Sequence, residues 1–159
     1  MIENIDDVCK HLTHGVYVIG VRDGELQNAF TAAWVMQVSF APPLLAISIN
    51  PEHYSYQLLK VGKICTVNVL AHDQMALAGH FGQSSKDKMA GFAWHQDQTG
   101  APILSDSLAY FDCRVSHFTE AGDHVIAICE VLGAAALKQG IPMLYGQTGD
   151  LDGSSELYE

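Results

Sequence analysis

The stretch Asn28–Asn50, NAFTAAWVMQVSFAPPLLAISIN, decides how this 159-residue chain folds and where it can bind a ligand. It opens with small and polar residues, passes through Trp34 into an apolar run, and pauses at Pro42-Pro43 before a second apolar run. A surface hairpin does not need so many small residues beside a lone Trp. Because small side chains let a flat ligand or another backbone approach closely, we expect this stretch to form the floor and one wall of a binding site.

Patterns on either side of this stretch predict a mainly β domain. Short β-branched and apolar runs predict strands over residues 15–22, 25–30, 34–40, 44–50, 64–70, 108–119, 124–136 and 141–146. Helical spacing predicts short helices over residues 4–12, 56–61 and 74–81, with N-caps at Asn4, Ser55 and Asp73. The polar segment 82–100 is expected to be a loop with at most one turn of helix.

These elements favour one fold class. About seven to nine strands are expected, many joined by short turns such as Asp23-Gly24 and residues 120–123, and Pro42-Pro43 must lie at a bend or edge. Helices do not follow each strand, which disfavours a doubly wound parallel sheet. A mostly antiparallel barrel with a few peripheral helices fits best.

Composition bounds the function. Residues 1–159 suit a single domain, with residues 150–159 as a mobile acidic tail. The formal charge is -10, from 18 acidic and 8 basic residues, which argues against nucleic-acid binding. Charged residues are only 16% of the chain, which suggests that part of the surface is hidden against a partner subunit. Neither a secretory signal pattern nor an apolar run of ~20 residues is present, so we expect a cytoplasmic protein without a membrane span.

The four cysteines and eight histidines give no metal motif. No CxxC, HxH, HxxxH or HExxH pattern occurs, and we expect no metal site. Three cysteines, Cys65, Cys113 and Cys129, lie in apolar strand-like runs and are expected to be inert core thiols in a reducing compartment.

Several residues could carry chemistry, and each also has an ordinary structural explanation. Ser55 at a helix N-terminus could bind a phosphate or simply cap the helix. The run Ser84–Lys88 could neutralise a phosphate or form a solvated loop. The aromatic residues could contact a planar ligand or pack in the core; they are Trp34, Phe81, Phe92, Trp94 and Tyr145. His124, after a Gly122-Asp123 turn, could donate a hydrogen bond or act on a proton, or be a polar turn residue.

Taken together, these pieces resemble the flavin reductase-like family, whose fold is an FMN-binding split β-barrel, antiparallel and Greek-key-like. The similarity runs from THGVYVIGVRDG to PMLYG, over nearly the whole chain. Its best markers, in chain order, are TAAW, VSFAPPLLAISIN, the helix start at Ser55, VNVLAHDQMALAGHFG, KDKMAGFAW and the GDH turn.

The resemblance implies a set of FMN-binding residues. Asn28 matches a position that contacts the flavin, and the segment along the isoalloxazine ring comprises Thr31, Ala32, Ala33 and Trp34. Ser48 and Asn50 match the strand end beside the ribityl chain. The phosphate ligands are Ser55 and Lys88, joined by Ser84 and Lys86. His124 matches a residue near the reactive edge of the flavin, and is thus the expected catalytic residue, and Tyr145 matches an aromatic near the ring.

The resemblance also implies an activity, with alternatives. Members are NAD(P)H:flavin reductases or flavoredoxin-like electron carriers. The sequence AAWVMQ is similar to that of flavoredoxin-like proteins and of flavin reductase modules of electron-transfer proteins. The implied cofactor is FMN, with FAD as the alternative, and NADH or NADPH is the implied electron donor. The implied assembly is a homodimer that could have a redox protein partner. Many reductases have Asn-Ser-Phe where this chain has Ala33-Trp34-Val35. A Trp there would cover the ring face that a hydride donor needs.

Three other functions therefore stay open. One is an FMN-binding electron carrier with no NAD(P)H site of its own. Another is a non-catalytic flavin- or haem-binding module, with His80 or His124 as the haem ligand. The last is an interaction protein without a cofactor.

Overall fold

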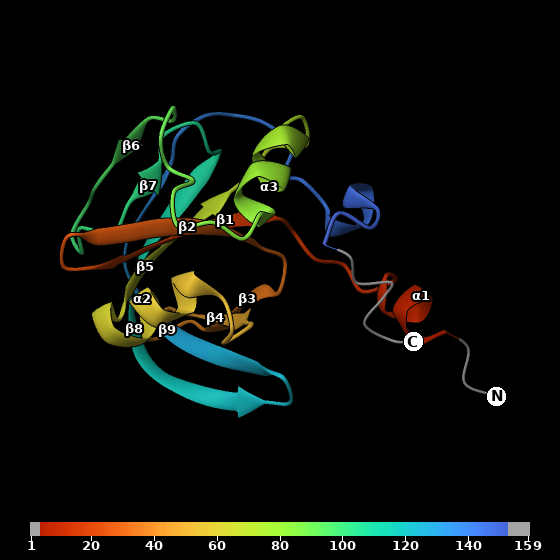
Figure 1. The fold of residues 1–159 in the computed structure, drawn as a ribbon, viewed down its shortest axis with the longest axis horizontal. Helices are drawn as coiled ribbons and strands as arrows, with labels where there is room; N and C mark the ends of the chain where they lie inside the picture. The colour runs from red at the N-terminus through yellow and green to blue at the C-terminus, as the bar shows by residue number, and fades with distance from the viewer. Residues whose placement is uncertain (1–3, 153–159) are drawn as a thin grey trace.

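The structure, a computed structural model, describes residues 4–152 (Figure 1). Within this range the main sheet has seven antiparallel strands in the order β2-β1-β5-β8-β9-β4-β3, and β6 pairs with β7 separately. The strands are β1 (Tyr17–Asp23), β2 (Leu26–Ala32), β3 (Val35–Ser39), β4 (Leu44–Ile49), β5 (Ile64–Val69), β6 (Trp94–His95), β7 (Ile103–Leu104), β8 (Ala109–Ala121) and β9 (His124–Ala136). The helices are α1 (Ile5–Cys9), α2 (Tyr54–Gly62), α3 (Met75–Gly82) and the 3-10 helix η1 (Tyr145–Thr148).

The sheet curls into a barrel, and the connection between β2 and β3 shows why. These two strands lie at opposite ends of the strand order, yet only Ala33 and Trp34 separate them along the chain. Since one residue spans at most about 3.6 Å, the two sheet edges must lie close together. The two sheet edges therefore meet at Ala33-Trp34. The predicted mainly β, antiparallel fold is confirmed.

The barrel interior is apolar and includes three of the cysteines. Ile19, Ile47 and Leu59 are fully buried there. Cys65, Cys113 and Cys129 are buried and free, as expected, and the Cys65 and Cys129 sulfurs lie 3.9 Å apart. Hydrogen bonding with the other two thiols, together with burial, raises the pKa of Cys65 well above its ordinary value, so this thiol is a protonated core group.

A second apolar cluster lies on the other face of β1, under α3. Val18 packs with Ala78 and Phe81 of α3, whereas its neighbour Ile19 packs in the barrel interior. Because successive strand residues point to opposite faces, β1 is buried on both sides, which explains its continuous rather than alternating apolar pattern. In Figure 1, α3 lies above the β1–β2 hairpin, and the long β8–β9 hairpin extends below the barrel.

Of the three predicted helix N-caps, one is confirmed and two were wrong. The Asn4 cap is confirmed, because its side chain accepts a hydrogen bond from the Asp6 N–H. The N-cap of α2 is His53 rather than Ser55, since an Asn50-based turn ends directly before it, with the Glu52 N–H donating to Asn50 Oδ1. The N-cap of α3 is Gln74 rather than Asp73, because the buried Gln74 side chain is hydrogen-bonded to two neighbouring loops.

Three predicted segments also differ. The first helix ends at Cys9 rather than residue 12. Segment 82–100 is not all loop, because Trp94–His95 pairs with Ile103–Leu104 as β6 and β7. Residues 141–146 do not form a regular strand; they make two isolated bridges and then enter η1. The outer part of the expected tail, residues 153–159, lies outside the described residues.

Candidate functional site

Three adjoining cavities form one groove beside β2, and they share Thr31 and His53. The narrow end, about 50 Å³, is lined by polar groups of Asn28, Ser55, Ser84, Ser85 and Lys88, among others. The wide end, about 210 Å³, is lined by Ala32, Ala33, Trp34, Ser48, Asn50 and His124, among others. The side cavity, also about 210 Å³, includes Tyr145 and Asp152. The stretch predicted to form the floor and wall of a site therefore does line a groove.

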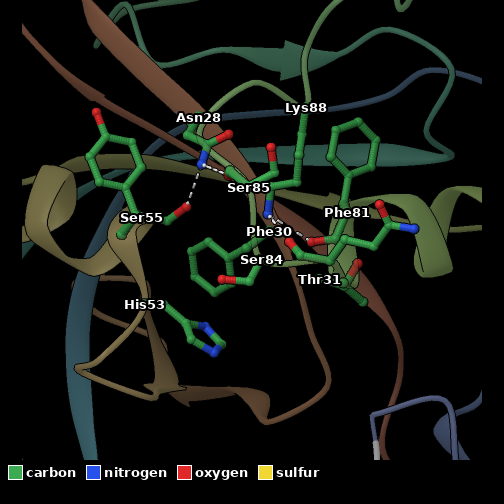
Figure 2. Close-up of a pocket in the computed structure, with 12 residues that line it drawn as sticks. Asn28, Phe30, Thr31, His53, Ser55, Phe81, Ser84, Ser85 and Lys88 are labelled. Atoms are coloured by element: carbon green, nitrogen blue, oxygen red, sulfur yellow. Dashed lines mark hydrogen bonds between the residues drawn. The ribbon is translucent and has the colours of Figure 1, made fainter.

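Asn28 organises the narrow end (Figure 2). Its Nδ2 donates to Ser55 Oγ at 3.2 Å and to the Ser85 carbonyl oxygen at 3.0 Å. Its Oδ1 is buried and has no hydrogen-bond partner among residues 4–152. Leaving a buried acceptor unpaired costs about 1–3 kcal/mol, so this oxygen calls for a ligand that brings an O–H or N–H donor.

Lys88 places a buried positive charge at the same end. The side chain is only 5% exposed, and its Nζ donates to the carbonyl oxygens of Phe81 at 3.1 Å and Gln83 at 2.9 Å. No carboxylate within the described part of the chain forms an ion pair with it. Burial lowers the pKa of Lys88 to about 8. A buried ammonium group without a counter-charge is costly, and a bound anion would offset that cost.

Of the other predicted phosphate-binding residues, Ser55 and Ser84 line the narrow end and Lys86 does not. Ser55 is the second residue of α2, so it stays in the first turn, where backbone N–H groups lack partners within the helix. Ser84 lines the narrow end. Lys86 is not among the lining residues; its Nζ lies instead 4.8 Å from the centre of the Tyr54 ring.

At the wide end, a tight turn positions His124. Gly122, with φ 62°, and Asp123 form a two-residue turn, and His124 follows as the first residue of β9. Its Nδ1 lies 2.7 Å from Asp123 Oδ1. Because a carboxylate only accepts, Nδ1 is the donor, which leaves Nε2 able to exchange a proton. Hydrogen bonding to His124 lowers the pKa of Asp123, so the carboxylate stays ionised.

Trp34 forms the outer wall of the wide end. Its ring centre lies 4.9 Å from that of His124, and the side chain is 40% exposed. Trp34 also lines a separate cavity of about 240 Å³ together with Lys10, His14 and Tyr145. The indole therefore stands between the groove and this neighbouring cavity.

The remaining predicted residues are held by local contacts. Thr31 Oγ1 donates to the Ala78 carbonyl oxygen at 2.7 Å, which ties β2 to α3. Asn50 uses its side chain in the turn before α2, as described above. Tyr145 packs edge-on against His14 and hydrogen-bonds to Asp152. The structure thus brings all the predicted residues except Lys86 to the groove lining.

His53 and Asp152 are among the groove residues that were missed from the sequence. His53 lines all three cavities, and burial, followed by the charges of Lys88 and His124, lowers its pKa. Its place in the turn just before Ser55 was a usable signal. Asp152 gave no signal, because it lies in a segment expected to be a mobile tail, and only the fold brings it to the groove.

Two observations bear on metal and haem binding. Within residues 4–152, no group of three His, Cys, Asp or Glu side chains could hold a metal ion. His80, one candidate haem ligand, is hydrogen-bonded to the Lys88 carbonyl oxygen at 2.7 Å and packs against Phe81 and Phe92. In the described part of the chain, no helix is both long and apolar enough to cross a bilayer.

Comparison with known proteins agrees with this fold. The family model described as "Flavin reductase like domain" matches residues 9–152. The "High molecular weight rubredoxin" of Moorella thermoacetica is 36% identical over 139 residues, which cover 84% of this chain and 61% of that protein. The "FMN reductase (NADH) RutF" of Variovorax paradoxus is 38% identical over 116 residues, covering 71% of this chain and 64% of that protein.

Solved structures show the same fold. The structure of the Streptomyces globisporus C-1027 NADH:FAD oxidoreductase SgcE6 superimposes with a TM-score of 0.84 at 27% identity, covering 91% of this chain and 88% of that one. The chain spans less than two thirds of the length of both curated relatives named above. The match over residues 9–152 and the shared barrel show that the chain belongs to the flavin reductase like domain family.

Proposed function

We propose that this chain is an FMN-binding oxidoreductase of the flavin reductase type, which takes electrons from NADH or NADPH and passes them on through the flavin. The observation that carries the proposal is the narrow end of the groove. There, Lys88, a buried ammonium without a carboxylate partner in residues 4–152, lines the same cavity as Asn28, whose buried Oδ1 has no hydrogen-bond partner in that range. The names of two relatives, "FMN reductase (NADH)" and "NADH:FAD oxidoreductase", support it.

The groove residues suit the parts of FMN in order. Ser55, Ser84 and Lys88 would hold the phosphate, and Asn28 Oδ1 would accept from a ligand hydroxyl or N–H. Ser48 and Asn50 would lie beside the ribityl chain. The residues along the ring would be Thr31, Ala32, Ala33 and Trp34, with Tyr145 nearby.

When bound, FMN supplies the redox chemistry, which includes accepting a hydride from a reduced nicotinamide. The protein's own groups bind and orient it. Lys88 balances the phosphate charge in an otherwise acidic chain. His124 is the proposed catalytic residue, because its Nε2 can hold or release a proton at the wide end while Asp123 fixes the tautomer.

A carrier without an NAD(P)H site is the second candidate, and Trp34 favours it. The indole packs on His124 at the wide end, where a nicotinamide would have to approach the ring. Such a carrier would receive its electrons from a protein donor. The name of the rubredoxin relative supports a redox protein partner.

We further propose a homodimer in the cytoplasm. Met36, Val38 and Phe40 on and beside the β3 edge strand are exposed, and an apolar cavity of about 420 Å³ lies beside them. Such exposed apolar patches are typical of interaction surfaces. Four free cysteines suit a reducing compartment.

The test is the visible spectrum of the purified protein before and after NADH or NADPH is added without oxygen. We expect flavin absorption bands that bleach with the nicotinamide. Bands that persist until a protein donor is added would identify the carrier, and bands that no donor bleaches would identify a non-catalytic flavin-binding module. A colourless protein that takes up no FMN would contradict the proposal.

A further inference from the structure

The loop of residues 83–88 is tied down over the narrow end of the groove. Asn28 Nδ2 donates to the Ser85 carbonyl oxygen at 3.0 Å, which fixes the middle of the loop to β2 (Figure 2). Lys88 Nζ donates to the Gln83 carbonyl oxygen at 2.9 Å, which draws the two ends of the loop together. The loop is therefore a fixed wall of the cavity.

A contact between Lys86 and Tyr54 joins this loop to α2. Tyr54 is the first residue of α2 and lines the narrow end. Lys86 Nζ lies 4.8 Å from the centre of its ring, within the range of a cation–π interaction. The contact joins the two walls that carry Ser55 and Ser85, although Lys86 itself does not line the cavity. A ligand that extended past the phosphate between these two walls would have to break the contact.

The volumes show how little room remains there. The narrow end holds about 50 Å³, against about 210 Å³ at the wide end. One buried ammonium group, Lys88, faces this space, and it matches a single terminal phosphate. A dinucleotide would need an opening for its second phosphate and its adenosine.

We propose that the chain selects the mononucleotide FMN over the dinucleotide FAD, and that the Tyr54–Lys86 contact is the gate that excludes the adenosine half. The inference rests on the proposed flavin-binding function and deepens it. In this proposal, selectivity comes from the obstruction of the larger ligand by the Tyr54–Lys86 contact as well as from contacts to the phosphate.

The experiment titrates the flavin-free protein with FMN, FAD and riboflavin and follows the quenching of flavin fluorescence. We expect FMN to bind more tightly than FAD by about tenfold or more. Lys86→Ala and Tyr54→Leu should each strengthen the binding of FAD and so bring the dissociation constants of FMN and FAD closer together, because each variant removes the Tyr54–Lys86 contact. Leucine is chosen because it keeps the apolar packing of Tyr54 while removing the ring. Lys60→Ala removes the same charge from the exposed last turn of α2 and should leave the ratio unchanged.

The outcomes separate the two proposals. Equal affinity of the native protein for FMN and FAD would overturn the selectivity and leave the flavin-binding function standing. An FMN preference that survives both gate variants, with their melting temperatures unchanged, would overturn the gate. Failure to bind any of the three flavins would remove the proposed function, and this inference with it.

Discussion

At the residue scale, Lys88 differs from an ordinary surface lysine in its environment. It is buried, its two hydrogen bonds go to neutral carbonyl oxygens, and its pKa is lowered to about 8 by burial. Neutral acceptors take two of its three N–H donors without cancelling its charge. The positive charge of Lys88 is therefore uncompensated and attracts an anion, to which Ser55 on the facing helix can donate a hydrogen bond.

Replacing both Ser55 and Lys88 with alanine should weaken FMN binding strongly. A hydrogen bond to a charged group contributes about 1.5–3 kcal/mol, and two such losses correspond to a factor of about 100 or more in Kd. Fluorescence titration of the double variant against native protein measures this, with Lys60→Ala as the charge-matched control. Unchanged affinity in the double variant would remove the phosphate assignment.

The affinity for FMN should also depend on pH through Lys88. A bound phosphate favours the ammonium form, so binding raises the pKa of Lys88 above its free value of about 8. Below pH 8 the group is charged before and after binding, and affinity is steady down to the phosphate's own second pKa of about 6. Above pH 8 binding must take up a proton, so affinity falls as pH rises.

Titrations of FMN between pH 6.5 and about 10 test this dependence. The Lys88→Met variant should bind more weakly and lose the decline above pH 8, whereas Lys60→Ala should keep it. A decline that persists in Lys88→Met would assign the titration to another group.

At the scale of elements, the position of α2 depends on its last residue. Gly62 packs so closely on the β1–β2 hairpin that a Cβ there would lie 1.8 Å from the Arg22 carbonyl oxygen. Only glycine lets the helix end approach the strand so closely. This approach holds α2, and with it Ser55, against the groove.

Gly62→Ala should therefore destabilise the fold by about 1–3 kcal/mol, or more if the backbone cannot shift. The melting temperature should fall by several degrees. Gly79→Ala within α3 is the matched control, since its Cβ would meet nothing closer than Leu151 at 3.8 Å and alanine favours helix. Equal melting temperatures for the native protein and the Gly62 variant would show that α2 is not held by this contact.

At the scale of the whole molecule, the barrel buries its interior but leaves an apolar surface at the β3 edge. Phe40 is 90% exposed and Met36 65% exposed, at the end of the sheet order. An uncovered edge strand with large apolar side chains invites association. A second copy of the chain is the partner that the homodimer proposal assigns to it.

Light scattering at micromolar concentration should give twice the mass of one chain. Placing charges in the interface with Met36→Asp and Phe40→Asp together should yield a monomer, because burying unpaired carboxylates is costly. Val61→Asp, at an equally exposed apolar position on α2, should remain dimeric. A native protein that runs as a monomer would contradict the assembly.

Much of this architecture was predictable from local sequence. The strands from Tyr17 to Val69 and the β8–β9 hairpin follow from apolar runs separated by turn signals such as Asp23-Gly24, Pro42-Pro43 and Gly122-Asp123, since those signals act between near neighbours. The helix caps at His53 and Gln74 were not predicted. The turn based on Asn50 places the first cap, and the hydrogen bonds of the Gln74 side chain with Ala71 and Asp106 hold the second. The pairing of Trp94 with Leu104 was equally hidden in a polar segment.

By itself, the sequence determined the β-rich class, the small-residue stretch at Thr31–Trp34 and the residue types that could answer a phosphate. Only the tertiary structure decided that Lys88 is buried without a carboxylate partner in residues 4–152, that Lys86 turns to Tyr54, and that Asp152 reaches the groove. The physical reason is distance along the chain. Strand pattern and turn chemistry are local, whereas burial, orphaned polar atoms and cavities arise only when segments far apart in the chain meet, as Thr31 and Asp152 do in the groove.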